Sequence, residues 1–239
     1  MSSLSKTPIS AEDFIQTVFT PDPKPIFFWD SCSLLDLLRL PYRKGTLSTL
    51  KSYIAIKVLM DSSTIYSVFS ELSIREWNDH FQKTIDETNY SLNLTSDYHG
   101  HSIDMINHIF STGLASEHIG NKGLVNEFES IADGILDNSI FLNTEKIANA
   151  ALNRVAAKSP PSKKKPEFKD CAIWETVLDL AATIQPSGKK VVFFTVNTED
   201  YVDKSRAPQL VIHSNIMSEA VTFGINVELT CEAAHLVII

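Results

Sequence analysis

The chain lacks the features that mark a secreted or membrane-spanning protein. No apolar run approaches the about 20 residues of a spanning helix, and the polar segment from Met1 to Ser10 has no apolar stretch of the secretory type. The three cysteines, Cys32, Cys171 and Cys231, are scattered and show neither disulfide nor zinc spacing. We therefore expect reduced thiols in a cytoplasmic protein that does not enter a membrane.

Positive charge is also scarce. Lys and Arg number 21 against 29 Asp and Glu, which gives the 239 residues a net charge of −8. Proteins that bind nucleic acid through long-range attraction are usually basic, so this balance argues against a strong non-specific binder. An enzyme whose carboxylates are neutralised by a bound cation stays open. Apolar residues make up 44% of the chain, enough for a full hydrophobic core.

Short apolar runs that alternate with helical patterns predict an α/β fold. The expected strands lie at residues 26–29, 64–69 and 190–196, with shorter candidates at 209–212 and 226–229. The expected helices between them lie at residues 10–20, 33–40, 46–60, 170–183 and 215–223. This alternation predicts a three-layer α/β/α sandwich with a central, mostly parallel sheet and helices on both faces.

The middle of the chain is expected to form a helical insertion in a single domain. It runs from about residue 86 to 157 and is predicted to contain a polar loop at 86–100. Helices are expected after this loop at residues 103–110, 124–136 and 144–157. A basic loop at residues 158–169 follows, since its prolines and lysines are incompatible with a helix or a central strand.

Acidic residues follow several predicted strands or begin the adjoining helices. Asp30 closes the first strand, Glu76 lies in the helix after the second, and Asp170 opens a later helix. Asn197 and Asp200 follow the strand at 190–196. Each residue alone has an ordinary explanation as a helix cap, a turn residue or a solvated helix residue. Together they lie where the carboxyl ends of parallel strands converge on one crevice.

Acidic side chains gathered in one crevice repel each other unless a cation lies between them. Carboxylate oxygens suit Mg²⁺ or Mn²⁺, whereas zinc usually takes His and Cys. We therefore predict a divalent-metal site for phosphodiester chemistry, with Asp30 and Asp170 as direct ligands. Glu76 and Asp200 would bind metal or orient the attacking water, and Asn197 would offer its amide to water or phosphate.

The ordered set of motifs resembles the PIN-domain nucleases, particularly a bacterial PIN-like subgroup. The stretches that carry this resemblance are residues 26–35, 70–77, 168–175 and 193–201. The resemblance selects Glu76 rather than Glu71 as the second acid. One departure is Asn197, which stands where many PIN domains carry another Asp and so weakens the expectation of a second metal.

The resemblance implies a single PIN-like nuclease domain over residues 1–239. It implies metal-dependent endonucleolytic cleavage of single-stranded RNA, with Mg²⁺ or Mn²⁺ as the cofactor. Many such proteins are toxins of toxin–antitoxin or defence systems. The partners to expect are therefore an RNA substrate, a protein inhibitor or antitoxin, and a second copy in a homodimer.

The predicted substrate contacts flank the acids. Lys163, Lys164, Lys165 and Lys169 precede Asp170 and would hold phosphates. A solvated linker explains these lysines equally well. The hydroxyl residues Ser31 and Thr195, at the ends of two predicted strands, complete the predicted substrate-binding set.

Three other functions compete with a ribonuclease. An aspartyl-nucleophile phosphotransferase needs a second Asp two residues after the first, and Cys32 stands there instead. A catalytically weak module that keeps the fold and acts by binding a partner is favoured slightly by the acidic net charge and by Asn197. A nuclease that cleaves DNA is a variant that the sequence leaves open.

Overall fold

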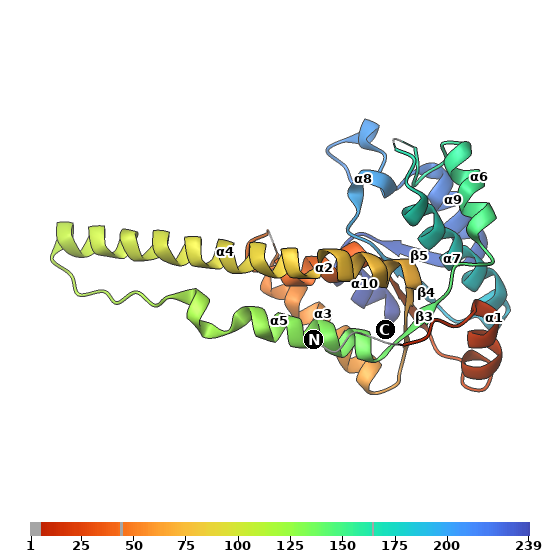
Figure 1. Cartoon of the computed structure of the whole chain (residues 1–239), viewed down its shortest axis with the longest axis horizontal. Helices are drawn as coiled ribbons and strands as arrows, with labels where there is room; N and C mark the ends of the chain where they lie inside the picture. The colour runs from red at the N-terminus through yellow and green to blue at the C-terminus, as the bar shows by residue number, and fades with distance from the viewer. Residues whose placement is uncertain (1–5, 44, 164) are drawn as a thin grey trace.

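The computed structural model describes residues 6–43, 45–163 and 165–239. At its centre is a five-stranded sheet in which all paired strands are parallel and the strand order is β3-β2-β1-β4-β5 (Figure 1). The strands are β1 (Ile26–Trp29), β2 (Tyr66–Ser70), β3 (Ser139–Leu142), β4 (Val191–Phe194) and β5 (Ile225–Glu228). The predicted α/β sandwich with a parallel central sheet is confirmed.

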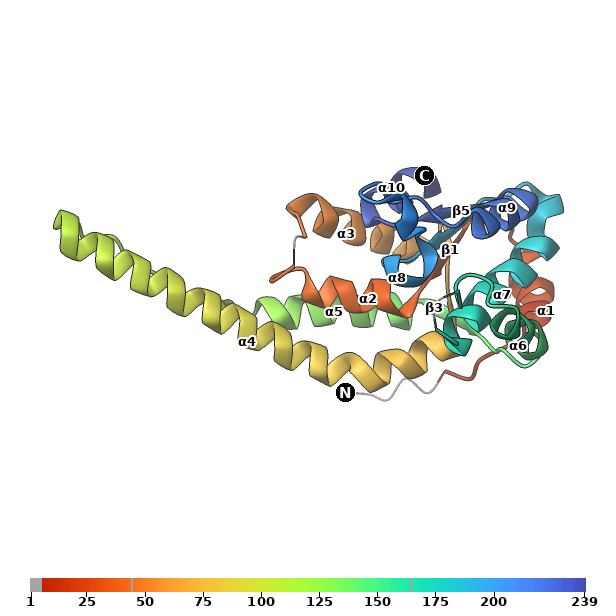
Figure 2. The same ribbon diagram turned by 90° about the horizontal axis from the view of Figure 1, so that it is seen from above.

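Helices cover both faces of the sheet (Figures 1 and 2). The α-helices are α1 (Ala11–Phe14), α2 (Ser31–Arg39), α3 (Leu47–Asp61), α4 (Glu71–Phe110), α5 (Leu124–Asp137), α6 (Ala148–Ala156), α7 (Phe168–Ile184), α8 (Thr198–Tyr201), α9 (Ser214–Phe223) and α10 (Cys231–Ile238). A π-helical turn at Ile15–Phe19 continues α1, and short 3₁₀ helices lie at Ile119–Lys122, Gln185–Ser187 and Lys204–Arg206.

The central strands are apolar throughout because each sends side chains into a core on either face. Phe27, Trp29 and Phe194 pack with residues of α2, α3, α5 and α10 in one core. Ile26 and Phe28 pack with residues of α1, α7 and α9 in the other. The two cores account for the three layers, and they hold the carboxyl ends of the strands in fixed register.

Several predicted elements differ from the structure. The segment 139–142 is strand β3, which pairs with β2, so the region predicted as a helical insertion at 86–157 supplies part of the central sheet. The helix expected at 144–157 covers only Ala148–Ala156. The strand expected at 209–212 is wrong, because only Ile212 pairs there, in an isolated bridge with Val202.

The polar loop predicted at residues 86–100 is also wrong. Helix α4 runs through it without a break for 40 residues. One side of this helix is buried, and three of the five buried residues between positions 81 and 96 are polar: Phe81, Thr84, Thr88, Leu92 and Ser96. The stripe that packs against the domain is therefore partly polar, which hides its helical periodicity in the sequence.

The far half of α4 extends beyond the sandwich, and the chain returns beside it to α5 (Figures 1 and 2). We call residues 90–118 the arm. Ser96 Oγ accepts a hydrogen bond from the backbone N–H of Ile119 (3.0 Å), which joins the two sides of the arm at its base. None of the helices in the described residues is long and apolar enough to cross a membrane.

The N-terminal segment covers one edge of the sheet. Ile9 forms an isolated parallel bridge with Leu142 of β3. Its N–H donates to the carbonyl of Phe141 (2.9 Å), and its carbonyl accepts from the N–H of Asn143 (2.9 Å). The strand at this edge thus has part of its outward-facing backbone paired.

Candidate functional site

The candidate site lies where the strand order reverses. Strands β1 and β4 are adjacent, and the chain continues outward in opposite directions from them, to β2 and β3 on one side and to β5 on the other. In open parallel sheets, ligands bind beyond the carboxyl ends of the strands at this switch point. Asp30 and Thr195 are the residues that directly follow β1 and β4. We call the space beyond them the crevice.

Asp30 is buried, with 1% of its surface exposed. Its Oδ2 accepts hydrogen bonds from Thr195 Oγ1 (2.6 Å) and Cys32 Sγ (2.8 Å), and its Oδ1 accepts one from Ser31 Oγ (3.3 Å). Burial, reinforced by the charge of Glu76, raises the pKa of the Asp30 carboxyl even though these hydrogen bonds oppose the shift. The carboxyl group is thus held in one orientation, and within residues 6–43, 45–163 and 165–239 it forms no ion pair with Lys, Arg or His.

Glu76 reaches the same crevice from α4. Its Oε2 accepts a hydrogen bond of 2.6 Å from Ser31 Oγ, so Ser31 lies between Glu76 and Asp30. Glu71 lies elsewhere: its Oε1 accepts from the N–H and the hydroxyl of Thr144 (2.9 and 2.8 Å). Among the described residues, Glu76 contacts a residue that follows β1, whereas the hydrogen bonds and ion pair of Glu71 are with Thr144 and Arg75.

Asp170 approaches from α7. The helix begins at Phe168 and Glu167 is its N-cap residue, so Asp170 lies in the first turn and does not cap the helix as the sequence predicted. Burial, followed by the charges of Asp30, Asp200, Glu76 and Glu167 in that order, raises the pKa of the Asp170 carboxyl to about 8. The charges of Asp30, Asp200 and Glu76 therefore all act on the Asp170 carboxyl.

Asn197 and Asp200 complete the rim beyond β4. Asn197 Nδ2 donates to Asp170 Oδ1 (3.4 Å), and its Oδ1 accepts from the Asp200 N–H (3.3 Å), which caps α8. Thr195 Oγ1 accepts from the Asn197 N–H (3.0 Å) while donating to Asp30. A chain of hydrogen bonds therefore joins Asp30 to Asp170 through residues of the β4 exit.

The donors in the crevice match a hard divalent cation in kind. They are carboxylate, hydroxyl and amide oxygens, and Mg²⁺ is usually bound by one or two carboxylates, several waters and substrate oxygens. Within the part of the chain that the structure describes, no three His, Cys, Asp or Glu side chains are arranged as a ready-made metal cage. The oxygen donors that are present fit a hard ion in kind.

The basic loop before α7 is an ordered part of the domain. Pro160, Pro161 and Ser162 are buried, and Ser162 Oγ donates to the Lys165 carbonyl (2.7 Å) while accepting from the Glu167 N–H (3.0 Å). With the loop held in this way, the side chains of Lys163 and Lys165 are exposed.

The predicted phosphate-binding lysines are all on the surface where they are described. Lys163, Lys165 and Lys169 are exposed, and Lys164 lies outside the described residues. Hydrogen bonds from Ser205 lower the pKa of Asp203, and the positive charge of Lys163 lowers it further. Lys163 is therefore near Asp203, in the segment that follows α8.

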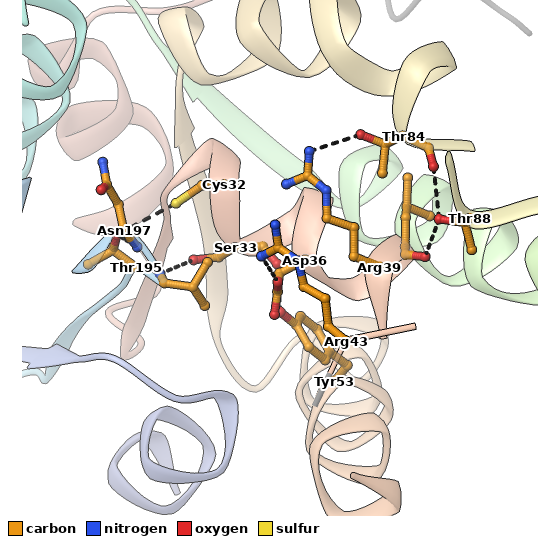
Figure 3. Close-up of polar contacts among 12 residues, drawn as sticks. Cys32, Ser33, Asp36, Arg39, Arg43, Tyr53, Thr84, Thr88, Thr195 and Asn197 are labelled. Atoms are coloured by element: carbon orange, nitrogen blue, oxygen red, sulfur yellow. Dashed lines mark hydrogen bonds and ion pairs between the residues drawn. The ribbon is translucent and has the colours of Figure 1, made fainter. Parts of the chain in front are cut away.

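Sequence reasoning did not assign roles to several polar residues on α2 (Figure 3). Cys32 holds Asp30, and Ser33 donates to the Phe194 carbonyl (3.0 Å) while accepting from the Val196 N–H (3.2 Å). Arg39 donates to Thr84 Oγ1 (3.2 Å), but its buried Nε has no partner. These residues lie two, three and nine positions after Asp30, on the helix that begins directly after it. Their place on this helix is the feature of the sequence that points to them.

Comparison with known proteins identifies the family of the chain. A family model described as PIN domain matches residues 28–201, well over half of the chain and inclusive of all four acids. No curated protein and no solved structure gives a match. PIN domains are generally nucleases. On the extent of the family match, the chain belongs to the PIN-domain family.

Proposed function

We propose that this protein is a metal-dependent endonuclease that hydrolyses single-stranded RNA in the crevice. The observation that carries the proposal is geometric: Ser31 Oγ lies within hydrogen-bond distance of both Asp30 and Glu76 (3.3 and 2.6 Å), and hydrogen bonds through Thr195 and Asn197 join Asp30 to Asp170 beyond the ends of β1 and β4. We also propose, as the family resemblance implies, that the protein is a cytoplasmic effector or toxin whose activity is controlled by a protein inhibitor.

Asp30, Glu76, Asp170 and Asp200 would hold a Mg²⁺ or Mn²⁺ ion. When bound, such an ion neutralises negative charge on the phosphodiester and lowers the pKa of a coordinated water. The residues of the chain position the ligands: Thr195, Cys32 and Ser31 fix Asp30 by hydrogen bonds. Burial raises the pKa of the Cys32 thiol well above its usual value, and the charge of Asp30 adds to this, so the thiol stays protonated and acts as a donor.

The substrate backbone would reach the crevice past the basic loop. Lys163, Lys165 and Lys169 offer exposed positive charge beside Asp170, in a protein whose net charge is otherwise negative. Phosphate contacts of this kind weaken as salt concentration rises, because binding releases condensed counterions. RNA, rather than DNA, follows from the family resemblance, so the two substrates are compared directly in the test.

The test is cleavage of a fluorescently labelled single-stranded RNA in the presence of Mn²⁺. We expect EDTA to stop cleavage, and Asp30→Asn and Asp170→Asn each to lower the rate by at least about 100-fold, roughly 2.7 kcal/mol of transition-state stabilisation. The matched control is Asp79→Asn, which neutralises an exposed acid on α4. Circular dichroism checks that each variant is folded. Wild-type rates in a folded Asp30→Asn or Asp170→Asn variant would contradict the mechanism.

A second candidate function is a non-catalytic module that binds a partner. It is favoured by the lack of a ready-made group of three metal-binding side chains among the described residues. Titration with Mn²⁺ by calorimetry separates the two functions. Binding that is lost in Asp170→Asn supports the nuclease, whereas no heat of binding in the wild type supports the module. Parallel assays on single-stranded DNA of the same sequence decide the nucleic acid.

A further inference from the structure

Beyond Ser96, the arm takes no part in the hydrophobic core. Helix α4 is buried on one side as far as Leu92 and Ser96. From Asp97 to Leu124, none of the side chains that the structure describes is buried. This part of the chain therefore adds no buried side chain to the core of the sandwich.

An apolar stripe runs along the exposed side of the arm. Its members recur at spacings of four, four, seven and four residues and are each between 37% and 69% exposed: Tyr90, Leu94, Tyr98, Met105 and Ile109. At 3.6 residues per turn they fall within roughly a 100° sector of the helix, opposite Leu92 and Ser96. The exposed side chain of His101 falls in the same sector, between Tyr98 and Met105. Exposed apolar side chains gathered on one side of a helix indicate a binding surface.

The apolar stripe continues around the tip of the arm. Ile106 (37% exposed), Phe110 (69%) and Leu114 (50%) lie on or just after the last turns of α4. Asn107 holds the returning chain in place, because its Nδ2 donates to the Leu114 carbonyl (2.9 Å) and its Oδ1 accepts from the Leu114 N–H (2.8 Å). The apolar side chains at the tip are thus presented by a fixed backbone.

The charge of the arm restricts what can cover the stripe. Between Lys83 and Lys122 the sequence contains no Lys or Arg and five acids, which are Asp86, Glu87, Asp97, Asp104 and Glu117. Such a surface repels nucleic acid and anionic lipid headgroups. It attracts a partner that carries positive charge beside an apolar face.

The acids also lie to one side of the stripe. Asp86, Asp97 and Asp104 are separated by eleven and seven residues, which puts them along a single flank of the helix. In an antiparallel pair of two copies, two-fold symmetry would set this flank against its own equivalent. Like charges would then face each other along the contact, so the arm is poorly suited to pair with a second copy in that way.

We propose that the apolar stripe of the arm docks an amphipathic helix of another protein, whose apolar face is flanked by Lys and Arg. Two helices with apolar stripes pack ridge into groove at a separation of about 8–10 Å. The basic flank of the partner would lie beside Asp97 and Asp104. The stripe is assigned from its own residues, and the proposal stands whether or not the crevice cleaves RNA.

The test uses the full chain and two labelled synthetic peptides of about 18 residues, or five helical turns. Both peptides carry the same leucine stripe, one flanked by lysines and the other by glutamates. Fluorescence anisotropy should show the lysine peptide binding at least about 10-fold more tightly, a difference of roughly 1.4 kcal/mol. The double variant Tyr98→Ser/Met105→Ser should bind the lysine peptide at least about 10-fold more weakly than wild type.

Matched controls distinguish binding to the arm from non-specific hydrophobic binding elsewhere on the protein. Val221→Ser/Leu236→Ser removes two equally exposed apolar side chains from α9 and α10 and should leave binding unchanged. Asp97→Asn/Asp104→Asn should weaken the lysine peptide several-fold at low salt, an effect that shrinks at high salt.

Three outcomes would overturn the proposal. The first is equal binding of the lysine peptide to wild type and to Tyr98→Ser/Met105→Ser. The second is equal binding of the two peptides to wild type. The third is a wild-type dimer in sedimentation that becomes a monomer in the same double variant, since this would assign the stripe to a second copy. Cleavage of RNA is measured in parallel and reports on the crevice alone.

Discussion

At the scale of single residues, Asp170 lies where burial and several other carboxylates act on one carboxyl group. Its proton is retained to about pH 8 in the folded chain, against an ordinary pKa of 3.8. In the unfolded chain the neighbouring charges are dispersed and the carboxyl is exposed to water. The folded protein therefore binds a proton that the unfolded protein releases.

This difference predicts how stability changes with pH when no divalent metal is present. Because the folded state holds more protons between pH 3.8 and about 8, the free energy of unfolding should fall as pH rises through that range. Asp170→Asn removes this contribution. Between about pH 5 and pH 8, the Tm of the wild type should fall by at least about 2 °C more than that of the variant. For a protein of this length, a change of about 1 kcal/mol in the free energy of unfolding shifts Tm by about 2–4 °C.

Differential scanning fluorimetry in EDTA at several pH values measures this slope. The control is Asp79→Asn, an exposed acid whose substitution should leave the wild-type slope unchanged. Added Mn²⁺ should raise the Tm of the wild type at pH 8 and have little effect on Asp170→Asn. A parallel pH dependence of wild type and Asp170→Asn would contradict the raised pKa.

The sequence predicts which residues approach the crevice better than it predicts how they are held. Asp30, Asp170 and Asn197 follow from their positions beside apolar runs. The hydrogen bond from Ser31 to Glu76 joins residues 45 positions apart, and the one from Thr195 to Asp30 joins residues 165 positions apart. Such contacts arise from the strand order and not from local pattern. The metal-binding and catalytic roles of these residues stay predictions.

At the scale of elements, Arg154 joins α6 to three neighbouring segments. Its guanidinium contacts Glu175 of α7 (2.7 Å) and Glu219 of α9 (2.8 Å) and donates to the Pro160 carbonyl (2.8 Å). Glu219 also accepts from Trp174 Nε1 (2.7 Å). One cation, with a side chain only 8% exposed, therefore fixes the basic loop against the helix that carries Asp170.

Arg154→Met should destabilise the protein because it leaves two partly buried carboxylates without their cation. We expect a loss of about 3 kcal/mol, the lower end of the cost of removing one partner from a buried ion pair. Urea denaturation followed by circular dichroism measures this loss. The control is Arg75→Met, which removes an exposed ion pair with Glu71 and should cost less than about 1 kcal/mol. Equal losses in the two variants would contradict the structural role of Arg154.

The elements differ in how well the sequence predicts them. Strands β1, β2 and β4 are apolar runs bounded by turn residues and were predicted within a few positions. Strand β3 was missed because Ser139–Leu142 follows the end of α5 after a single residue, so no turn signal separates the strand from the helix in the sequence. The middle of α4 was missed because Asn, Ser and Thr favour helices weakly. That segment is helical because Thr88 and Leu92 are buried against the domain, a tertiary effect.

At the scale of the whole molecule, the sandwich and the arm have different physical bases. The sandwich buries apolar side chains in a core on each face of the sheet. The arm consists of the far half of α4, whose residues have low helix propensity, and of the returning segment beside it. Hydrogen bonds at Ser96 and Asn107 join the returning segment to the helix. The two parts should therefore respond independently to mutation.

Replacing residues 99–116 with a short Gly-Asn-Gly turn should leave the sandwich folded. The removed segment contains no buried side chain, and its ends are already close, since His118 Nε2 lies 3.7 Å from Asp97 Oδ1. We expect Tm to change by less than about 3 °C, which corresponds to about 1 kcal/mol. The radius of gyration from small-angle X-ray scattering should fall.

Wild type and shortened protein are compared in the same RNA cleavage assay. An unchanged rate is expected, because the crevice acids lie directly after β1, on α7, on α8 and in the first turns of α4. Loss of the cooperative unfolding transition in the shortened protein would show that the arm contributes to the core after all.

The bridge between Ile9 and Leu142 has a practical consequence for handling the protein. Beyond β3 the sheet would otherwise end in a bare row of backbone donors and acceptors, a template on which other chains can assemble into aggregates. Ile9 occupies two of those positions. Fusion tags are therefore better attached at the C-terminus, and trimming the first ten residues to aid crystallisation would expose this row to solvent.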